Sequence, residues 1–364
     1  MKKHLPVLDG IRGMAVLMVM WFHYPKSSSP FLESLFHRPL PNFSVIGQTG
    51  VDLFFVLSGF LITRILLNSK TEEKYFSVFY ARRLLRIFPL YYFYLVLSLF
   101  ILPIIAGEKT PDFSQYWYWL AHLQNLPMTF GWDSVGPEFY WSLAVEEHFY
   151  LLWPLLVYCL PLRKIAIVSM AMIIASFAIR LWMLTFDMST FYFTLTRLDS
   201  LSFGALLAVL EPRLLVPTAL NKRVFLWLLS ITGVPLLLAF TVLSGSGAMW
   251  LQAIKFPLTG LVYFALLGFA VTSNEESAFK KIFESRGLRF LGGISYGLYV
   301  YHGLCFSWFE QVVPNRYLTL LMPIAFLLSV VVAYVSFRVL ESPFLKLKRF
   351  FRHGAIERTV SASS

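Results

Sequence analysis

Arg12 and His23 lie in the first apolar stretch of the chain, which reads LDGIRGMAVLMVMWFHY from residue 8 to residue 24. A guanidinium stabilises negative charge, and an imidazole with an unperturbed pKa of about 6.5 takes up a proton near neutral pH. On an α-helix their spacing leaves the two side chains within roughly 20° of one face, about 16 Å apart along the axis. Because burying an arginine in a bilayer costs about 2.5 kcal/mol or more, we expect this face to line a polar cavity. Alternatively, Arg12 reaches the nearer membrane surface and His23 lies at the far interface.

Two further carboxylates accompany this pair. Asp9 precedes Arg12 by three residues and shares its side of the helix, so it is the expected partner of the Arg12 charge. Asp52 lies near the start of the second apolar stretch, GVDLFFVLSGFLITR. A carboxylate entering a bilayer needs a partner, and His23 or Arg12 would serve. Gly59, in the same stretch, is interpreted as a point of close helix packing.

The stretch PEFYWSLAVEEHFYLLWP holds a third group of acids. Glu138, Ser142 and Glu146 are spaced by four residues and share one helix face, whereas Glu147 and His148 are expected to point elsewhere. Two adjacent acids at this depth are difficult to explain as a lipid-facing surface. They either line the same cavity or hold another buried cation.

Basic residues cluster in YARRLLRIFPLYY. Arg83 and Arg86 are three residues apart on one helix face, with Arg82 adjacent. Two guanidinium groups at one membrane mouth suit a phosphorylated ligand, because each can donate paired hydrogen bonds to phosphate oxygens. Anchoring to anionic lipid headgroups is the alternative. His302, in LGGISYGLYVYHG, is interpreted as a core histidine whose hydrogen bonds are satisfied.

The composition of the chain predicts the elements that hold these residues. Of 364 residues, 57% are hydrophobic and only 14% are charged, which is typical of an all-α polytopic membrane protein. The first apolar run carries Arg12 and lacks a small-residue cleavage site, so no cleavable signal peptide is expected. We predict ten transmembrane helices, at residues 8–24, 47–67, 87–106, 139–160, 165–185, 195–211, 224–243, 251–272, 291–309 and 318–340.

The basic residues between these spans predict the topology. With the N-terminus inside, about 22 Lys and Arg fall in inner segments and four in outer ones. This ratio favours both termini in the cytoplasm. Topology therefore explains the net charge of +11 better than nucleic-acid binding does. Cys159 and Cys305 both lie in apolar runs, so neither a disulfide framework nor a cysteine-based metal site is indicated, and no metal is expected.

Seven motifs in order make the chain resemble the acyltransferase-3 family of integral-membrane O-acyltransferases. They are LDGIRGMAVLMVMWFH, GVDLFFVLSGFLIT, YARRLLRIFPLYY, FYWSLAVEEHFYLLWPLL, RLDSLSFGALLA, LGGISYGLYVYHG and LESPF. The resemblance implies a transmembrane acyltransferase domain at 1–345 and a basic cytoplasmic tail at 346–364. The chain resembles the family's stand-alone members, which lack the esterase-like domain fused to some relatives.

This resemblance also implies an activity: O-acylation, most often O-acetylation, of a cell-surface polysaccharide, glycolipid or other glycosylated acceptor at the cell membrane. Acetyl-CoA or another acyl-CoA is the implied donor, bound from the cytoplasm. The family's Arg-x10-His pattern falls on Arg12 and His23, and its Arg-x-x-Arg pattern on Arg83 and Arg86. Its acidic WSL-x-x-E position falls on Glu146. One departure is a histidine, residue 148, where relatives commonly have Gln.

Together these features predict a mechanism. Neutral His23 takes the proton from an acceptor hydroxyl as the hydroxyl attacks the thioester, and a covalent acyl-imidazole is the variant. Asp52 or Glu146 orients the imidazole, while Arg12 stabilises the oxyanion or positions the thioester. The rival is a transporter or flippase that uses the buried charges as a proton relay and substrate gate. Acceptor identity, acyl chain length, the side of transfer and the oligomeric state are left open.

Overall fold

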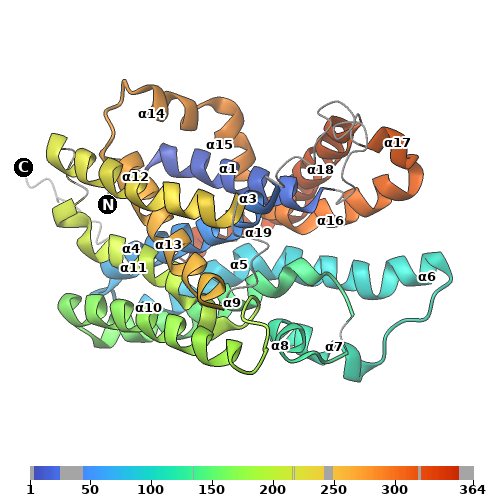
Figure 1. Ribbon diagram of the computed structural model, residues 1–364. Helices are drawn as coiled ribbons and strands as arrows, with labels where there is room; N and C mark the ends of the chain where they lie inside the picture. The colour runs from blue at the N-terminus through green and yellow to red at the C-terminus, as the bar shows by residue number, and fades with distance from the viewer. Residues whose placement is uncertain are drawn as a thin grey trace, which may run out of the picture.

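The computed structural model describes residues 4–24, 44–133, 135–214, 216, 218–241, 249–318 and 321–351. Within these ranges the chain is all-helical and contains no strand. Figure 1 shows the helices in chain order. They are α1 (Pro6–His23), α3 (Ser44–Gln48), α4 (Gly50–Ser69), α5 (Tyr75–Val96), α6 (Leu102–Ala106), α7 (Phe113–Leu120), α8 (Asn125–Phe130), α9 (Trp141–Cys159), α10 (Leu162–Leu184), α11 (Thr194–Leu214), α12 (Ala219–Thr241), α13 (Met249–Thr272), α14 (Ala278–Phe283), α15 (Arg286–Gly293), α16 (Ser295–Val312), α17 (Asn315–Leu318), α18 (Met322–Ser336) and α19 (Ser342–Lys346).

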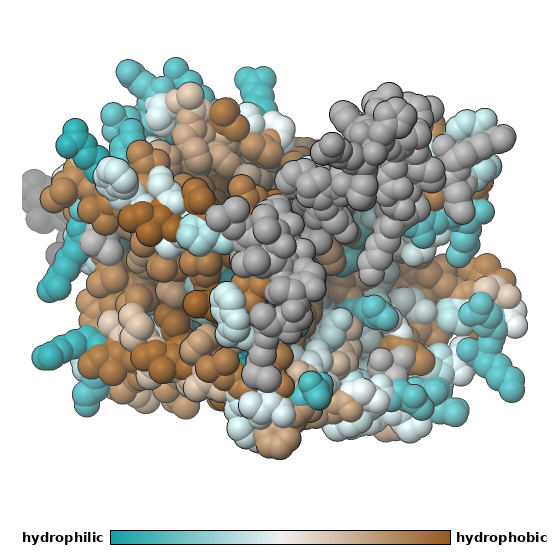
Figure 2. All heavy atoms as spheres, viewed as in Figure 1, coloured by the Kyte–Doolittle hydropathy of each residue, from teal (hydrophilic) through white to brown (hydrophobic). Residues whose placement is uncertain are grey.

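Six helical segments of the described chain are long and apolar enough to cross a membrane. Figure 2 shows apolar side chains over much of the viewed surface, with hydrophilic groups mainly at its periphery. A polytopic membrane protein fits both observations. The six segments are Ile46–Ser69, Tyr75–Ala106, Leu162–Leu184, Ala219–Leu237, Trp250–Thr272 and Met322–Phe350.

The other four predicted spans are helical but fall outside these six segments. They correspond to α1, α9, α11 and α16. The first three carry buried or half-buried charges, including Arg12, Glu146 and Arg197. Buried polar residues therefore weaken the hydropathy signal of the helices that hold them.

One segment is longer than the sequence predicts. The third span was expected to start at residue 87, but α5 begins at Tyr75 and continues through a π-helical turn, Leu97–Ile101, into α6. The basic residues Arg82, Arg83 and Arg86 lower the hydropathy of the first turns without interrupting the helix, because arginine is a good helix former. At the other end of the chain, a π turn (Phe337–Glu341), α19 and a 3₁₀ turn (Leu347–Phe350) continue the last helix. Most of the predicted tail, residues 352–364, lies outside the described residues.

Helix α4 contacts α1, α9, α11 and α13, and it packs most extensively against α11. The close approach requires glycine. A Cβ atom on Gly59 would lie 1.9 Å from the carbonyl oxygen of Leu201, and one on Gly204 would lie 2.0 Å from that of Val56. The predicted packing role of Gly59 is confirmed, and this contact holds one wall of the candidate site close to α11.

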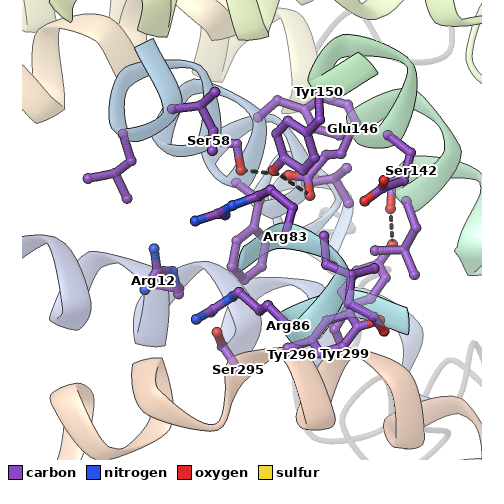
Figure 3. Close-up of a pocket in the computed structure, with 18 of the residues that line it drawn as sticks. Arg12, Ser58, Arg83, Arg86, Ser142, Glu146, Tyr150, Ser295, Tyr296 and Tyr299 are labelled. Atoms are coloured by element: carbon purple, nitrogen blue, oxygen red, sulfur yellow. Dashed lines mark hydrogen bonds between the residues drawn. The ribbon is translucent and has the colours of Figure 1, made fainter. Parts of the chain in front are cut away.

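Helix α1 packs against α15 in the same manner. A Cβ atom on Gly292 would lie 1.9 Å from the carbonyl oxygen of Asp9, and one on Gly13 would lie 2.2 Å from that of Leu288. The α1 helix also contacts α4 and α16. These contacts leave the Arg12 side chain between α4, α5 and α16, as the close-up view shows (Figure 3).

An ion-pair network joins α4, α10 and α11. Arg197 donates from Nη2 to Asp52 Oδ1 at 2.8 Å, and Ser200 Oγ donates to the same oxygen at 2.8 Å. Arg180 Nη2 donates to Asp199 Oδ2 at 2.7 Å. The side chains of both arginines are fully buried. We use "ion-pair network" below for these five residues.

Candidate active site

The described chain contains a cavity of about 230 Å³ between α1, α4, α5, α9 and α16. Its charged lining residues are Arg12 from α1, Arg83 and Arg86 from α5, and Glu146 and Glu147 from α9. Figure 3 shows the three arginine side chains directed into the same space. Apolar side chains such as those of Phe54, Leu61 and Ile62 form much of the rest of the wall. A cavity with apolar walls and a few convergent polar groups is the usual form of a small-molecule site.

Positive charge is concentrated at one side of this cavity. Arg12 lies 3.7 Å from Asp9, measured from Nη1 to Oδ1, so the predicted local ion pair is confirmed. The charges of Arg83 and Arg86 both act unfavourably on the Arg12 cation. A bound polyanion would relieve this repulsion, and guanidinium groups can grip phosphate or carboxylate oxygens in pairs.

Glu146 faces the cavity as predicted, and its carboxylate is held by two hydroxyl groups. Ser58 Oγ donates to Oε1 at 2.7 Å, and Tyr150 OH donates to Oε2 at 3.1 Å (Figure 3). Glu147 lines the cavity too, so the expectation that it points elsewhere is wrong. Adjacent residues on a helix differ by about 100°, which a wide cavity contacting α9 can span.

Arg82 does not line the cavity, although it adjoins Arg83 in sequence. Its guanidinium Nη1 donates to the backbone carbonyl of Phe351 at 3.2 Å, in an exposed position. Of the three arginines in this part of α5, only Arg83 and Arg86 line the cavity. The structure thus separates Arg82 from the two arginines with which it was grouped.

His23 lies outside the cavity lining. Its Nδ1 is 2.9 Å from the Val19 carbonyl oxygen. Because a carbonyl oxygen only accepts, the ring Nδ1–H is the donor of this hydrogen bond. The imidazole ring lies 5.0 Å from that of His302, between centroids, and the His302 ring is 5.8 Å from that of Tyr299. Because Tyr299 lines the cavity, these three rings form a connection from the cavity to His23.

Asp52 is not paired with His23 or Arg12, so that expectation is wrong. Its carboxylate belongs to the ion-pair network, where Arg197 and Ser200 bind one oxygen. Arg197 also lies over aromatic rings, with its Cζ atom 4.3 Å from the centroid of Phe256 and 5.3 Å from that of Phe191. The packing of α4 on α11 brings Arg197 to Asp52, whereas the carboxylate does not line the cavity that holds Arg12.

Several hydroxyl-bearing residues of the site had no functional role in the sequence reading. No role is assigned to Ser58 or Tyr150 from the sequence. The spacing that links Ser142 to Glu146 continues to Tyr150, so helical periodicity would have found it. The contact between Ser58 and Glu146 joins two helices, and no pattern within one segment reports it.

A hydrogen-bonded group that includes Tyr299 and Ser142 forms part of the cavity wall. Tyr299 OH and Ser142 Oγ are 2.5 Å apart, and Tyr299 OH lies 2.7 Å from the Phe139 carbonyl oxygen, to which it donates. Within the described ranges, no group of three or more His, Cys, Asp or Glu residues is arranged to hold a metal ion.

A family model described as an acyltransferase domain matches residues 5–338. The chain belongs to this acyltransferase family. The match confirms the resemblance carried by the seven sequence motifs and covers every residue that lines the cavity.

Two curated relatives of this acyltransferase family member align over almost the whole chain. The peptidoglycan O-acetyltransferase OatA of Listeria monocytogenes is 30% identical over 375 residues, which cover 95% of this chain and 56% of the relative. The O-acetyltransferase OatA of Staphylococcus aureus is 27% identical over 372 residues, which cover 94% and 58%. The chain thus spans little more than half the length of these relatives. No solved structure matches it.

Proposed function

We propose that this protein is a membrane O-acyltransferase that moves an acyl group, most simply acetyl, from acyl-CoA to a hydroxyl of a cell-envelope glycan. Family membership supports the reaction class. The names of the two relatives, one of them a peptidoglycan O-acetyltransferase, favour a peptidoglycan hydroxyl within the wider class of polysaccharide and glycolipid acceptors.

The observation that carries the proposal is the convergence of three arginines on one cavity. Arg83 and Arg86 hold the phosphate groups of the donor, because their guanidinium groups line the cavity side by side on α5. The apolar walls accommodate the pantetheine arm. Arg12 adds a third guanidinium group to the same cavity and helps to hold the donor. It lies roughly 16 Å along α1 from His23, so it does not reach the acyl carbon that is attacked beside His23.

His23 is the general base of the proposed reaction. Its Nδ1–H donates to the Val19 carbonyl, so the neutral ring presents Nε2 as the proton acceptor. The acceptor O–H bond breaks as its oxygen attacks the acyl carbon, and the thiolate of CoA leaves and takes up the proton. The Val19 carbonyl, and not Asp52 or Glu146, orients the imidazole ring of His23. Glu146 instead offsets the positive charge of the arginines that line the cavity.

For the thioester to reach His23, the donor has to pass Tyr299. The hydroxyl of Tyr299, in the cavity wall, interacts with Ser142 and with the Phe139 carbonyl. Movement of this side chain is therefore part of the proposed reaction cycle. It would join the donor cavity to the region that holds His23.

The proposed topology has ten transmembrane helices in the cell membrane with both termini in the cytoplasm. All ten predicted spans coincide with helices, and six of them qualify by length and composition alone. The positive-inside distribution supports the orientation. Arg83 and Arg86 would then face the cytoplasmic pool of acyl-CoA, and His23 would lie towards the outer surface, with residues 346–364 as a cytoplasmic tail.

The decisive experiment measures acyl transfer from radiolabelled acetyl-CoA in membranes that contain matched amounts of folded wild type or variant. Wild type should label a glycan or lipid-linked glycan fraction, and His23→Ala should not. The double variant Arg83→Ala, Arg86→Ala should raise the KM for acetyl-CoA at least about tenfold, because each lost charged hydrogen bond contributes roughly 1.5–3 kcal/mol.

Arg82→Ala is the matched control, since this arginine adjoins the pair but lies outside the cavity. Its KM should stay near the wild-type value. Equal transfer by wild type and His23→Ala would exclude His23 as the base. Absence of CoA-dependent labelling by wild type would reject acyl-CoA as the donor. Equal increases in KM on substitution of each of the three arginines would favour general attraction of acetyl-CoA by surface charge.

A further inference from the structure

The chain beyond residue 338, where the family match ends, packs against the basic part of α5. Both α19 and the 3₁₀ turn Leu347–Phe350 contact α5. Phe351 links the two regions through its backbone. Its N–H donates to the Lys348 carbonyl at 3.2 Å, and its own carbonyl accepts from the guanidinium of Arg82. The turn therefore lies beside the segment of α5 that carries the two cavity arginines.

Lys348, in this turn, is a half-buried cation whose surroundings are also positive. Within the described chain, three charges act on its ammonium group, and all three are unfavourable: those of Arg82, Arg83 and Arg86. No acceptor for its Nζ is present among the described residues, in contrast to Lys70, whose Nζ donates to a backbone carbonyl at 2.6 Å. An anion that binds here would relieve the repulsion and give the ammonium a partner.

Arg83 and Arg86 are neighbours of two separate cations. Their charges act unfavourably on Arg12 from α1 and also on Lys348. Arg12 lines the cavity and Lys348 does not, and the charge of Arg12 is not among those that act on Lys348. Positive charge therefore extends from the cavity, past the two arginines of α5, to the turn that carries Lys348.

We propose that Lys348 binds the 3′-phosphate of the acyl-CoA donor and so favours acyl-CoA over thioesters that lack this phosphate. This inference rests on the function proposed above. In CoA the pantetheine arm is followed by a diphosphate and then by a ribose that carries the 3′-phosphate. The order of these groups matches the order of the cavity, the pair Arg83 and Arg86, and Lys348. A phosphomonoester carries about −1.5 to −2 charges at pH 7, and a lysine ammonium binds it as a point charge.

Anionic lipid headgroups offer phosphate chemistry of the same kind, and basic residues at a membrane surface bind them. The position of Lys348 favours the donor. Its ammonium is half-buried beside two arginines that line the cavity, so a phosphate held there can belong to the same molecule as the groups inside the cavity.

The test measures the dissociation constants of CoA and 3′-dephospho-CoA for the full chain in nanodiscs of phosphatidylcholine, which has no net charge. Wild type should bind CoA at least about tenfold more tightly, because 3′-dephospho-CoA lacks the charged contact. Lys348→Gln should bind both ligands alike, whereas Lys348→Arg should retain the preference for CoA. Lys346→Gln is the matched control, since Lys346 lies on the same segment in an exposed position, and it should keep the wild-type ratio. Thermal midpoints of all four proteins are measured alongside.

Equal affinity of wild type for the two ligands, an unchanged ratio in Lys348→Gln, or the same loss of preference in Lys346→Gln would overturn the proposal. A second set of nanodiscs contains phosphatidylglycerol. An unchanged ratio in Lys348→Gln, together with less phosphatidylglycerol retained by that variant, would assign Lys348 to a lipid headgroup.

The same measurements separate this inference from the proposed function. If wild type binds CoA and 3′-dephospho-CoA equally, the donor assignment stands and the role of Lys348 fails. If wild type binds neither ligand, both fail. If wild type prefers CoA through Lys348 but transfers no acetyl group from acetyl-CoA, the proposed reaction fails and the phosphate site stands.

Discussion

The ion-pair network and the cavity both bury arginines next to carboxylates, but they differ in how the charges are matched. In the network, Arg197 binds Asp52 and Arg180 binds Asp199, each through a direct contact of 2.8 Å or less. Among the described residues, the closest arginine–carboxylate pair of the cavity arginines is that of Arg12 with Asp9, at 3.7 Å. Each arginine of the network is thus paired with a carboxylate, whereas the cavity leaves guanidinium groups around open space.

This difference distinguishes charges that hold the helices together from charges that can bind a ligand. A buried charge needs a partner, and in the network that partner is another side chain on a neighbouring helix. In the cavity the arginines repel one another and surround a volume that a ligand can enter. Burial of a charged residue in a membrane helix therefore does not identify a functional site by itself. Accessible space between the buried charges is the additional feature that indicates a functional site.

The largest expected effect comes from breaking the network. Arg197→Ala would leave the Asp52 carboxylate buried without its cation, which costs about 3–5 kcal/mol of unfolding free energy. Thermal unfolding followed by size-exclusion chromatography in detergent should show a large loss of folded protein. Arg83→Ala is the matched comparison, because this arginine lines the cavity, and its thermal midpoint should remain near that of wild type. Similar destabilisation by the two changes would contradict the distinction.

An intermediate effect is expected for Arg12→Lys. Lysine preserves the positive charge beside Asp9 but cannot present two parallel N–H donors to one oxygen group. We expect the KM for acetyl-CoA to rise about tenfold while the thermal midpoint stays unchanged, because a lost charged hydrogen bond to the donor costs roughly 1.5–3 kcal/mol. A wild-type KM for acetyl-CoA in Arg12→Lys would mean that Arg12 serves only to neutralise Asp9.

The smallest effect is expected for Ser58→Ala. The change removes one of the two hydroxyl groups that hold Glu146 and should cost about 1 kcal/mol of unfolding free energy, with a modest decrease in kcat. Ser295→Ala is the control, because Ser295 also lines the cavity but donates only to the carbonyl of Gly292 in the preceding helix. If the control lowers kcat as much as Ser58→Ala does, the carboxylate contact has no special role.

Much of the fold could be predicted from hydropathy and helical periodicity. Each of the ten predicted segments contains a helix, because apolar runs of this length satisfy their backbone hydrogen bonds within themselves. Helix ends were less predictable. Hydropathy reports side-chain polarity and not backbone conformation, so it missed the turns of α5 that carry Arg82, Arg83 and Arg86.

The candidate site was predictable where its residues share one helix. The pairing of Asp9 with Arg12, the joint orientation of Arg83 and Arg86, and the inward position of Glu146 all follow from a repeat of 3.6 residues per turn. Partners on different helices were not predictable in this way. Asp52 was expected to meet His23 or Arg12, and it meets Arg197, which lies 145 residues further along the chain.

Residue types and local spacing were therefore enough to indicate a helical membrane protein, its family and the helix faces that carry chemistry. These are properties of single segments, and helical geometry follows from the order of residues within each one. The choice between a closed ion pair and an open cavity required the packed molecule. The close glycine contacts of Gly59 and Gly204 set how α4 packs on α11 and so joined Asp52 to Arg197. The packing of α9 on α4 joined Ser58 to Glu146, and that of α16 on α1 brought His302 to His23.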